Sequence, residues 1–224
     1  MSQEPSGIFD MLGPIMIGPS SSHTAGVVRI ARVAHFLLGG PPDEVKVSFY
    51  NSFAMTYKGH GSDKAVLAGL MGFAVDDERI RDALAIAEAQ GIRYAFDPVI
   101  SSAKNHPNTL YIHARRDKRQ ISIEGISRGG GLILITAIDE LHTNFTGQLP
   151  TLVIRARDVR GAVSFITAIL AYDSVNIATL TVSRRAKDDL ALQVYELDEP
   201  PRPESLNYIQ TLSWVFEATL IPPV

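Results

Sequence analysis

The chain has 224 residues, of which 46% are hydrophobic and 20% are charged, and its formal net charge at pH 7 is −3. This length is comfortable for two domains with buried cores. The small net charge gives no electrostatic basis for binding nucleic acid or an anionic membrane, and no apolar run is long enough for a transmembrane helix.

Two further features of the sequence restrict the possible metal sites and the expected location of the protein. The sequence contains no cysteine, so the chain can form no disulfide and no cysteine-ligated metal site of its own. The N-terminal residues Met1–Pro5 lack the basic and apolar regions of a secretion signal. We therefore expect a cytoplasmic protein.

The first distinctive segment is the run Gly-Pro-Ser-Ser-Ser-His-Thr-Ala-Gly at positions 18–26. Pro19 discourages a helix before it, and serines are favoured N-cap residues. Residues 27–38 are almost continuously apolar, which predicts a buried helix that ends at the glycines and prolines of 39–42. The hydroxyl groups and His23 should therefore surround a helix N-terminus, where free N–H groups and the helix dipole favour a carboxylate or a phosphate.

The middle of the chain, residues 43–138, alternates between strand and helix patterns. Val45, Val47 and Phe49 alternate with polar residues, as in a half-buried strand. The remaining predicted elements are helices at 62–73 and 77–90, strands at 92–96, 109–115 and 120–126, and a last strand that begins at Ile133. The polar turn at 116–119 predicts a hairpin between two of these strands.

Residues 139–150 are polar and contain Gly147 and Pro150, which predicts a linker. The last segment, 151–224, has its own pattern of apolar residues. Its predicted elements are a strand that ends at Asp158, a helix at 163–170, strands at 175–183 and 190–197, a helix at 203–210 and a strand at 212–221. This order, βαββαβ, is the ferredoxin-like pattern. We therefore expect an α+β protein with domains at 1–138 and 151–224.

Four sites in this pattern have both a structural and a functional interpretation. His23 is either a helix-start residue turned to solvent or part of a binding site. His60 lies between two glycines, where the backbone can approach a ligand, or it belongs to a flexible turn. Ser62 and Asp63 are equally well explained as the N-cap of the next helix. The triple glycine at 129–131 is either a tight turn or a ligand loop.

Several of these segments together resemble a known family. The run Ile-Gly-Pro-Ser-Ser-Ser-His-Thr-Ala-Gly at 17–26 resembles the signature of the iron–sulfur-dependent L-serine dehydratases. Further matches in the same order are Lys-Gly-His-Gly-Ser-Asp-Lys-Ala at 58–65 and the glycines at 129–131. The resemblance covers residues 1 to about 138. In two-chain members of the family these motifs belong to the smaller, beta chain.

The resemblance implies an L-serine ammonia-lyase that converts L-serine to pyruvate and ammonia, an activity of amino-acid catabolism and gluconeogenesis. The family works through a 4Fe-4S cluster held by cysteines, and this chain has none. The cluster would therefore sit on a cysteine-bearing alpha chain, and the enzyme would be active only with that partner. The resemblance further implies an N-terminal α/β serine-dehydratase beta domain, similar to the allosteric-substrate-binding type. We expect a homodimer or a heterotetramer, with no nucleic-acid or membrane partner.

The resemblance also implies roles for individual residues. The catalytic candidates are His23 and His60, because removal of the α-proton needs a base and an imidazole suits that task near neutral pH. Which histidine is the base stays open. The candidates for binding the substrate are Ser20, Ser21, Ser22, Thr24, Ser62 and Asp63. No metal ligand is expected on this chain.

The segment 151–224 resembles an ACT domain, a small module that often senses amino acids. A regulatory ligand would then bind near Asp158, Gly161 and Asn176 or at the domain boundary. Arg160 stands where members of that family usually carry a proline, which weakens the argument for ligand binding. Sheet edges that are usually covered predict self-association of this segment.

Three alternatives belong to other functional classes. A free-standing amino-acid sensor would bind serine without a cysteine-bearing partner. A regulatory fragment of a phosphoglycerate dehydrogenase is a variant of that idea, although the sequence has no Gly-x-Gly-x-x-Gly fingerprint for a dinucleotide. A serine hydrolase would use Ser21 or Ser22 beside His23, but adjacency in sequence is not triad geometry and no Gly-x-Ser-x-Gly elbow is present.

Overall fold

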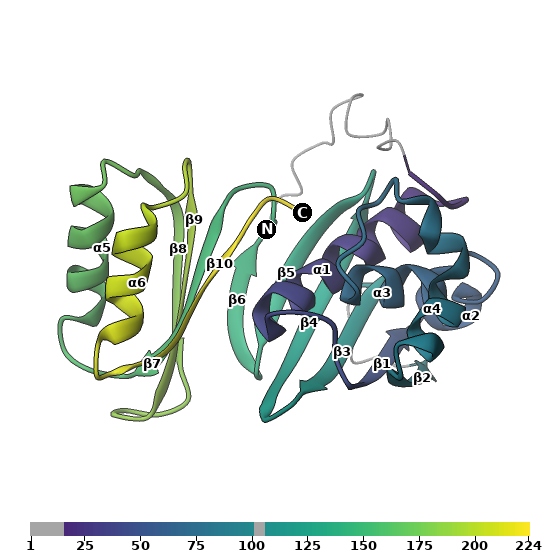
Figure 1. Cartoon of the computed structure of the whole chain (residues 1–224), viewed down its shortest axis with the longest axis horizontal. Helices are drawn as coiled ribbons and strands as arrows, with labels where there is room; N and C mark the ends of the chain where they lie inside the picture. Colours follow the sequence, from purple (N-terminus) through teal and green to yellow (C-terminus); the bar gives the residue numbers. More distant parts are fainter. Residues whose placement is uncertain (1–15, 101–105) are drawn as a thin grey trace. The chain divides into compact units, whose positions relative to one another are not determined.

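The N-terminal part of the chain is built on a six-stranded sheet with the strand order β2-β1-β3-β4-β5-β6 (Figure 1). The structure is a computed structural model that describes residues 16–100 and 106–224. The strands are β1 (Glu44–Tyr50), β2 (Arg93–Val99), β3 (Thr109–Arg116), β4 (Arg119–Gly129), β5 (Leu132–Ile138) and β6 (Leu141–Phe145). β1 pairs in parallel with β2 and antiparallel with β3, which continues antiparallel into β4.

Helices lie over one face of this sheet (Figure 1). They are a π-helical turn η2 (Ser21–Ala25), α1 (Gly26–Leu38), α2 (Ser52–Thr56), α3 (Ser62–Leu70), a 3-10 turn η3 (Glu78–Asp82) and α4 (Ala83–Ala89). In β1, Val45, Val47 and Phe49 are buried while Glu44 and Lys46 are exposed, as the alternation predicted. The strand therefore contributes one face to the core.

Helix α1 is the centre of the N-terminal core. It ends where predicted, at Gly39, which adopts the left-handed conformation (φ 71°). It packs against α3 and β4. A Cβ atom on Gly69 of α3 would lie 2.3 Å from the Val28 carbonyl oxygen of α1, so glycine permits this close approach of the two helices.

Two predictions about secondary structure need correction. The stretch 139–150, predicted to be a linker, contains β6, in which Leu141, Thr143 and Phe145 are buried and alternate with exposed residues. Its short apolar alternation is enough to pair the segment with the sheet. The helix predicted to begin at Asp77 starts instead as the 3-10 turn η3 and becomes α-helical only at Ala83.

The chain divides into two compact units, Met1–Ile135 and Thr136–Val224, and the division falls inside β5. The C-terminal unit holds β7 (Thr151–Arg157), α5 (Ala162–Tyr172), β8 (Ile177–Arg184), β9 (Leu190–Leu197), α6 (Pro203–Thr211) and β10 (Val215–Ile221). From Thr151 onward, the elements therefore follow the predicted order βαββαβ.

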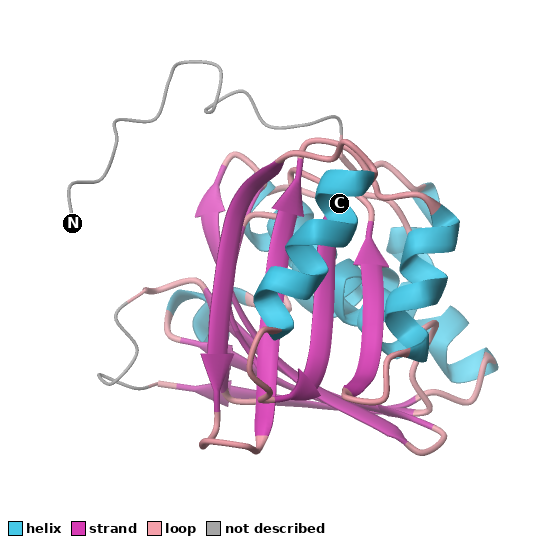
Figure 2. Cartoon of the chain, turned by 90° about the vertical axis from the view of Figure 1, so that its left-hand side faces the viewer, coloured by secondary structure: helices cyan, strands magenta, loops and turns pink. Residues whose placement is uncertain are grey.

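These four strands form an antiparallel sheet with the order β10-β7-β9-β8. Both helices cover one face of the sheet (Figure 2). The core between them contains Ile154, Ile166, Leu170 and Tyr195, all fully buried. The structure thus confirms a mixed α+β fold with two sheets. None of the helices in the described ranges has the length and apolar character that crossing a membrane requires.

Candidate functional site

The serine-rich run forms a tight π-helical turn in front of α1. Ser20 is its N-cap: its backbone is extended (φ −144°, ψ 124°) and its hydroxyl oxygen accepts the N–H of His23 at 3.2 Å. The same oxygen lies 3.2 Å from Nδ1 of the His23 ring. Ser20 therefore fixes both the main chain and the imidazole of His23.

The second motif is a turn that delivers His60 to the N-terminus of α3. Gly61 caps this helix in the left-handed conformation (φ 69°), which glycine adopts without steric cost. The N–H of His60 donates to the Thr56 carbonyl at 2.9 Å, and the N–H of Ser62 donates to the Tyr57 carbonyl at 2.7 Å. These bonds hold the histidine on a defined turn.

Two reciprocal hydrogen bonds join the motifs. The Thr24 hydroxyl donates to the His60 carbonyl at 3.3 Å, and the Ser62 hydroxyl donates to the His23 carbonyl at 2.8 Å. Thr24 is 1% exposed and Ser62 is completely buried. Each motif therefore holds the main chain of the other motif's histidine.

As a result, the rings of His23 and His60 are in contact. Their centroids are 4.6 Å apart, and the planes meet edge to face at 76°. On its other side the His23 ring meets the ring of Phe53, with centroids 4.9 Å apart. Nε2 of His23 and Nδ1 of His60 are buried and have no hydrogen-bond partner in the described part of the chain. Both nitrogens therefore lack the hydrogen bond that buried polar atoms usually have.

Burial controls the charge of His23, which is only 9% exposed. Loss of hydration disfavours the imidazolium form, and the neighbouring His60 acts in the same direction, so the pKa of His23 is lowered. His23 is therefore neutral at neutral pH and can exchange a proton.

A cavity of about 250 Å³ opens beside His60. Thr24 and the glycines Gly18, Gly59 and Gly61 line it, together with three cationic side chains, Lys58, Lys64 and Arg81. The sequence did not single out these cations, although Lys58 and Lys64 lie within the second motif. Arg81 comes from η3, and no local pattern links it to the motif.

The triple glycine lies close to the same end of α1. Gly129, Gly130 and Gly131 have φ values of 101°, 59° and 82°, a conformation that explains three consecutive glycines. Arg29 of α1 donates to the Gly131 carbonyl at 2.6 Å. A Cβ atom on Gly129 would lie 3.8 Å from the Ser22 hydroxyl oxygen. The three motifs therefore meet in one region.

The remaining substrate-binding candidates fall into two groups. Ser21 and Ser22 are partly exposed, and their hydroxyl groups form no hydrogen bond within the described ranges, so they are open to a ligand. The Ser62 hydroxyl proton, by contrast, is used in the contact with His23. The Asp63 carboxylate accepts the N–H of Lys64 at 2.8 Å, as in a helix start.

In the C-terminal unit, the regulatory candidates Asp158 and Gly161 share the loop between β7 and α5, and Asn176 lies apart from them at the other end of β8. Asp158 forms an ion pair at 2.6 Å with Arg184 at the end of β8, and this hydrogen bond lowers the pKa of the Asp158 carboxyl. Asn176 precedes the start of β8 and donates to Asp198 at 2.8 Å. Gly161 begins α5 in the left-handed conformation. Both polar side chains are thus engaged in contacts within the unit.

Known proteins resemble the chain over most of its length. The family model of the serine dehydratase beta chain matches residues 7–137. The probable L-serine dehydratase beta chain of Bacillus subtilis is 41% identical over 214 residues, which are 96% of this chain and 97% of that protein. The L-serine dehydratase beta chain of Peptoniphilus asaccharolyticus is 33% identical over 193 residues, 86% of this chain and 87% of that protein.

A protein with another name is also similar. The D-3-phosphoglycerate dehydrogenase of a Synechocystis strain is 27% identical over 184 residues, which are 81% of this chain but 33% of that protein. This match involves only a part of the dehydrogenase, whereas the two beta chains match almost end to end.

Proposed function

The chain belongs to the serine dehydratase beta chain family, and from this premise we propose that it is the beta chain of an L-serine dehydratase, which converts L-serine to pyruvate and ammonia. One observation carries the proposal: His23 and His60, in ring contact at 4.6 Å beside a cavity, lie within the matched residues. Paired imidazoles with unpartnered nitrogens are suited to moving a proton.

The iron–sulfur cluster of such an enzyme does not fit this chain. The sequence has no cysteine to supply thiolate ligands. In the ranges 16–100 and 106–224, no group of three or more His, Cys, Asp or Glu residues is arranged to hold a metal ion. We therefore assign the cluster to a cysteine-bearing alpha chain that completes the pocket. The departure of the β-hydroxyl group is not assigned to any residue of this chain.

For the proton on the α-carbon, we assign the base to His60. His60 lines the cavity, whereas His23 lies behind it against Phe53. The Ser20 hydroxyl accepts the His23 N–H and can donate its own proton to Nδ1 of that ring, which would place the proton of neutral His23 on Nε2. His23 then supports the ring of His60 through the edge-to-face contact, and His60 accepts the proton.

We assign the carboxylate of L-serine to the hydroxyl groups of Ser21 and Ser22. These groups are open to a ligand and belong to the turn that Ser20 caps. Neutral hydroxyl donors bind a carboxylate without titrating near neutral pH. After the proton and the hydroxyl group have left, the aminoacrylate product tautomerises to an imine, and hydrolysis of the imine gives pyruvate and ammonia.

The experiment is reconstitution with the partner. The chain is coexpressed under anaerobic conditions with a cysteine-bearing chain encoded next to it, and pyruvate release from L-serine is measured. We expect a stable complex that is active, while this chain alone is inactive. Pyruvate formation by the pure chain, or failure of the two chains to associate, would refute the proposal.

For the C-terminal unit we propose an ACT-type regulatory role and self-association. The βαββαβ order and the edge strand β10 support it, since strand edges are usually covered. A small amino acid would bind either at the turn that holds Asp158 and Gly161 or near Asn176. Calorimetry with serine and other amino acids tests the binding, and sedimentation at micromolar concentration tests the association. If no amino acid gives a heat of binding, the regulatory role is refuted. If the chain sediments only as a monomer, the self-association is refuted.

A second candidate function is an amino-acid-sensing module without catalysis. The similarity to a D-3-phosphoglycerate dehydrogenase favours it, because a segment similar to 81% of this chain also occurs in a protein that is not named a serine dehydratase. The sensor would bind serine alone and would not need a cysteine-bearing partner. The reconstitution distinguishes the two, since a sensor adds no pyruvate-forming activity to any partner.

A further inference from the structure

The cavity beside His60 has an unusual charge. Three cationic side chains line it, from the second motif (Lys58, Lys64) and from η3 (Arg81). Among the described residues that line it, none carries a carboxylate. The lining is therefore cationic, and the cations are not neutralised inside the cavity.

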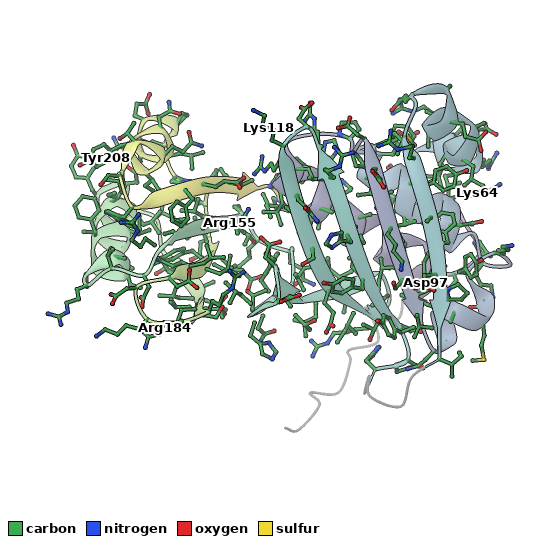
Figure 3. The ribbon with its side chains drawn as sticks, turned by 90° about the horizontal axis from the view of Figure 1, so that it is seen from below. Lys64, Asp97, Lys118, Arg155, Arg184 and Tyr208 are labelled. Atoms are coloured by element: carbon green, nitrogen blue, oxygen red, sulfur yellow. The ribbon has the colours of Figure 1, made fainter. Side chains whose placement is uncertain are left out.

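These cations also lack partners elsewhere in the described part of the chain. No ion pair or hydrogen bond of their side chains is found there, and Lys58 only lies 5.8 Å from the centre of the Tyr57 ring. Neighbouring cations differ in this respect: Arg79, also on η3, pairs with Asp77 at 2.6 Å, and Lys46 pairs with Asp97 at 3.3 Å. No acidic group of the cavity lining neutralises the three cations, of which Lys64 (labelled in Figure 3) lies in the first turn of α3.

The shape of the cavity gives an anion access to these groups. Glycines at 18, 59 and 61 leave it without side chains at three positions of its wall. The cavity lies at the N-terminus of the nine-residue helix α3, where the helix dipole adds positive potential. An anion in the cavity would meet three cations and no carboxylate, and 250 Å³ is enough for a molecule of a few carbon atoms.

We propose that Lys64 and Arg81, assisted by Lys58, bind a small carboxylate in this cavity. The binding site itself follows from the cavity; only the identity of the carboxylate rests on the proposed function. It is either the carboxylate of L-serine in turnover, in which case Ser21 and Ser22 would contact another polar group of the substrate, or that of a second molecule, such as the product pyruvate, acting beside the reacting substrate. Either carboxylate would form the same charge-assisted hydrogen bonds with the three cations.

Binding to the full chain alone is the first test. Calorimetric titrations use pyruvate and L-serine as probes with the wild type, Lys64→Gln and Arg81→Gln. The matched controls are Arg79→Gln, which alters the paired arginine of the same turn, and Lys118→Gln, an exposed lysine in the β3–β4 turn. We expect saturable binding of at least one probe, a dissociation constant raised about tenfold in each cavity variant through loss of a charge-assisted hydrogen bond, and no change in the controls.

Two results would overturn the proposal. One is the absence of saturable binding of both probes to the wild type at millimolar concentration. The other is binding that Lys64→Gln and Arg81→Gln leave unchanged. Neither readout needs the alpha chain or turnover, so an inactive two-chain complex with normal probe binding would refute the proposed function and leave the carboxylate site in place.

Kinetics of the two-chain enzyme then distinguish the sources. If the cations hold the substrate, the cavity variants raise KM for L-serine and leave kcat nearly unchanged. If they hold a second carboxylate, KM stays as in the wild type and the effect of added pyruvate on the rate disappears. Either outcome supports the site and names its occupant.

Discussion

The imidazole rings of His23 and His60 meet edge to face with their centroids 4.6 Å apart, although they come from separate segments of the chain. The contact is possible because the Thr24 and Ser62 hydroxyls hold the carbonyls of the opposite histidines. The pair is therefore a single unit of structure, and substitutions at either ring should affect the other.

Removing either imidazole should greatly reduce turnover. In the two-chain enzyme we expect His60→Ala and His23→Ala each to lower kcat by about two to four orders of magnitude, the scale of a general acid–base group. Cluster content should not change, since neither ring is proposed as a ligand. The control is His113→Ala, at an exposed position on β3. A double variant that folds, keeps its cluster and turns over L-serine normally would exclude this chain from the catalytic pocket.

Two serines should behave differently because their hydroxyls have different partners. Ser21→Ala removes a hydroxyl that is open to a ligand, so we expect mainly a higher KM. The lost hydroxyl contact is worth about 1 kcal/mol of binding free energy. Ser62→Ala removes the donor to the buried His23 carbonyl, so the free energy of unfolding should fall by about 1–3 kcal/mol. Steady-state kinetics and urea unfolding of both variants measure the difference. Equal effects on KM would contradict the distinction.

The chain should lose stability on mild acidification. Burial lowers the pKa of His23, and of His106, below the ordinary value of 6.5. In the window between these lowered values and 6.5, the unfolded chain binds more protons than the folded chain, so the free energy of unfolding falls as the pH falls. Urea unfolding between about pH 7.5 and about pH 5.5 measures this slope.

The variants His23→Gln and His106→Gln should each flatten that slope. The carboxyls of Asp77 and Asp158 have lowered pKa values and titrate at more acidic pH, so they do not contribute in this window. A slope that is unchanged when both histidines are replaced would assign the pH dependence to other groups.

Gly69→Ala should destabilise the N-terminal unit. The added methyl group would meet the Val28 carbonyl oxygen at 2.3 Å, and a backbone atom cannot rotate away. We expect a loss of about 1–3 kcal/mol in the free energy of unfolding. Gly59→Ala is the control, because the nearest atom to its Cβ would be 3.7 Å away. If the two variants were equally stable, α1 and α3 would not approach as closely as described.

Local periodicity was sufficient to predict most of the elements. The alternation of Val45, Val47 and Phe49, the polar turn at 116–119 and the βαββαβ order at 151–221 depend on residues that are neighbours in sequence, and the structure confirms them. The strand β6 was missed because only Leu141 and Phe145 mark its buried face as apolar. The π-helical turn has no periodic signal of its own in five residues.

The candidate site was predictable only in part, because its motifs are local in sequence and its contacts join distant segments. The motifs identified His23 and His60, but their ring contact depends on folding that brings distant segments together. Phe53 and Arg81 lie outside the motifs, and only the tertiary structure places them beside the histidines or the cavity. The second role of Ser62, as a donor to the His23 carbonyl, likewise depends on a contact between separate segments.

The reciprocal hydrogen bonds of Thr24 and Ser62 end on main-chain oxygens, which every amino acid possesses. The frame is thus independent of which side chains occupy positions 23 and 60. Replacing both histidines would remove the reactive groups and keep the loops in place. A pocket built in this way can lose its chemistry and keep its shape.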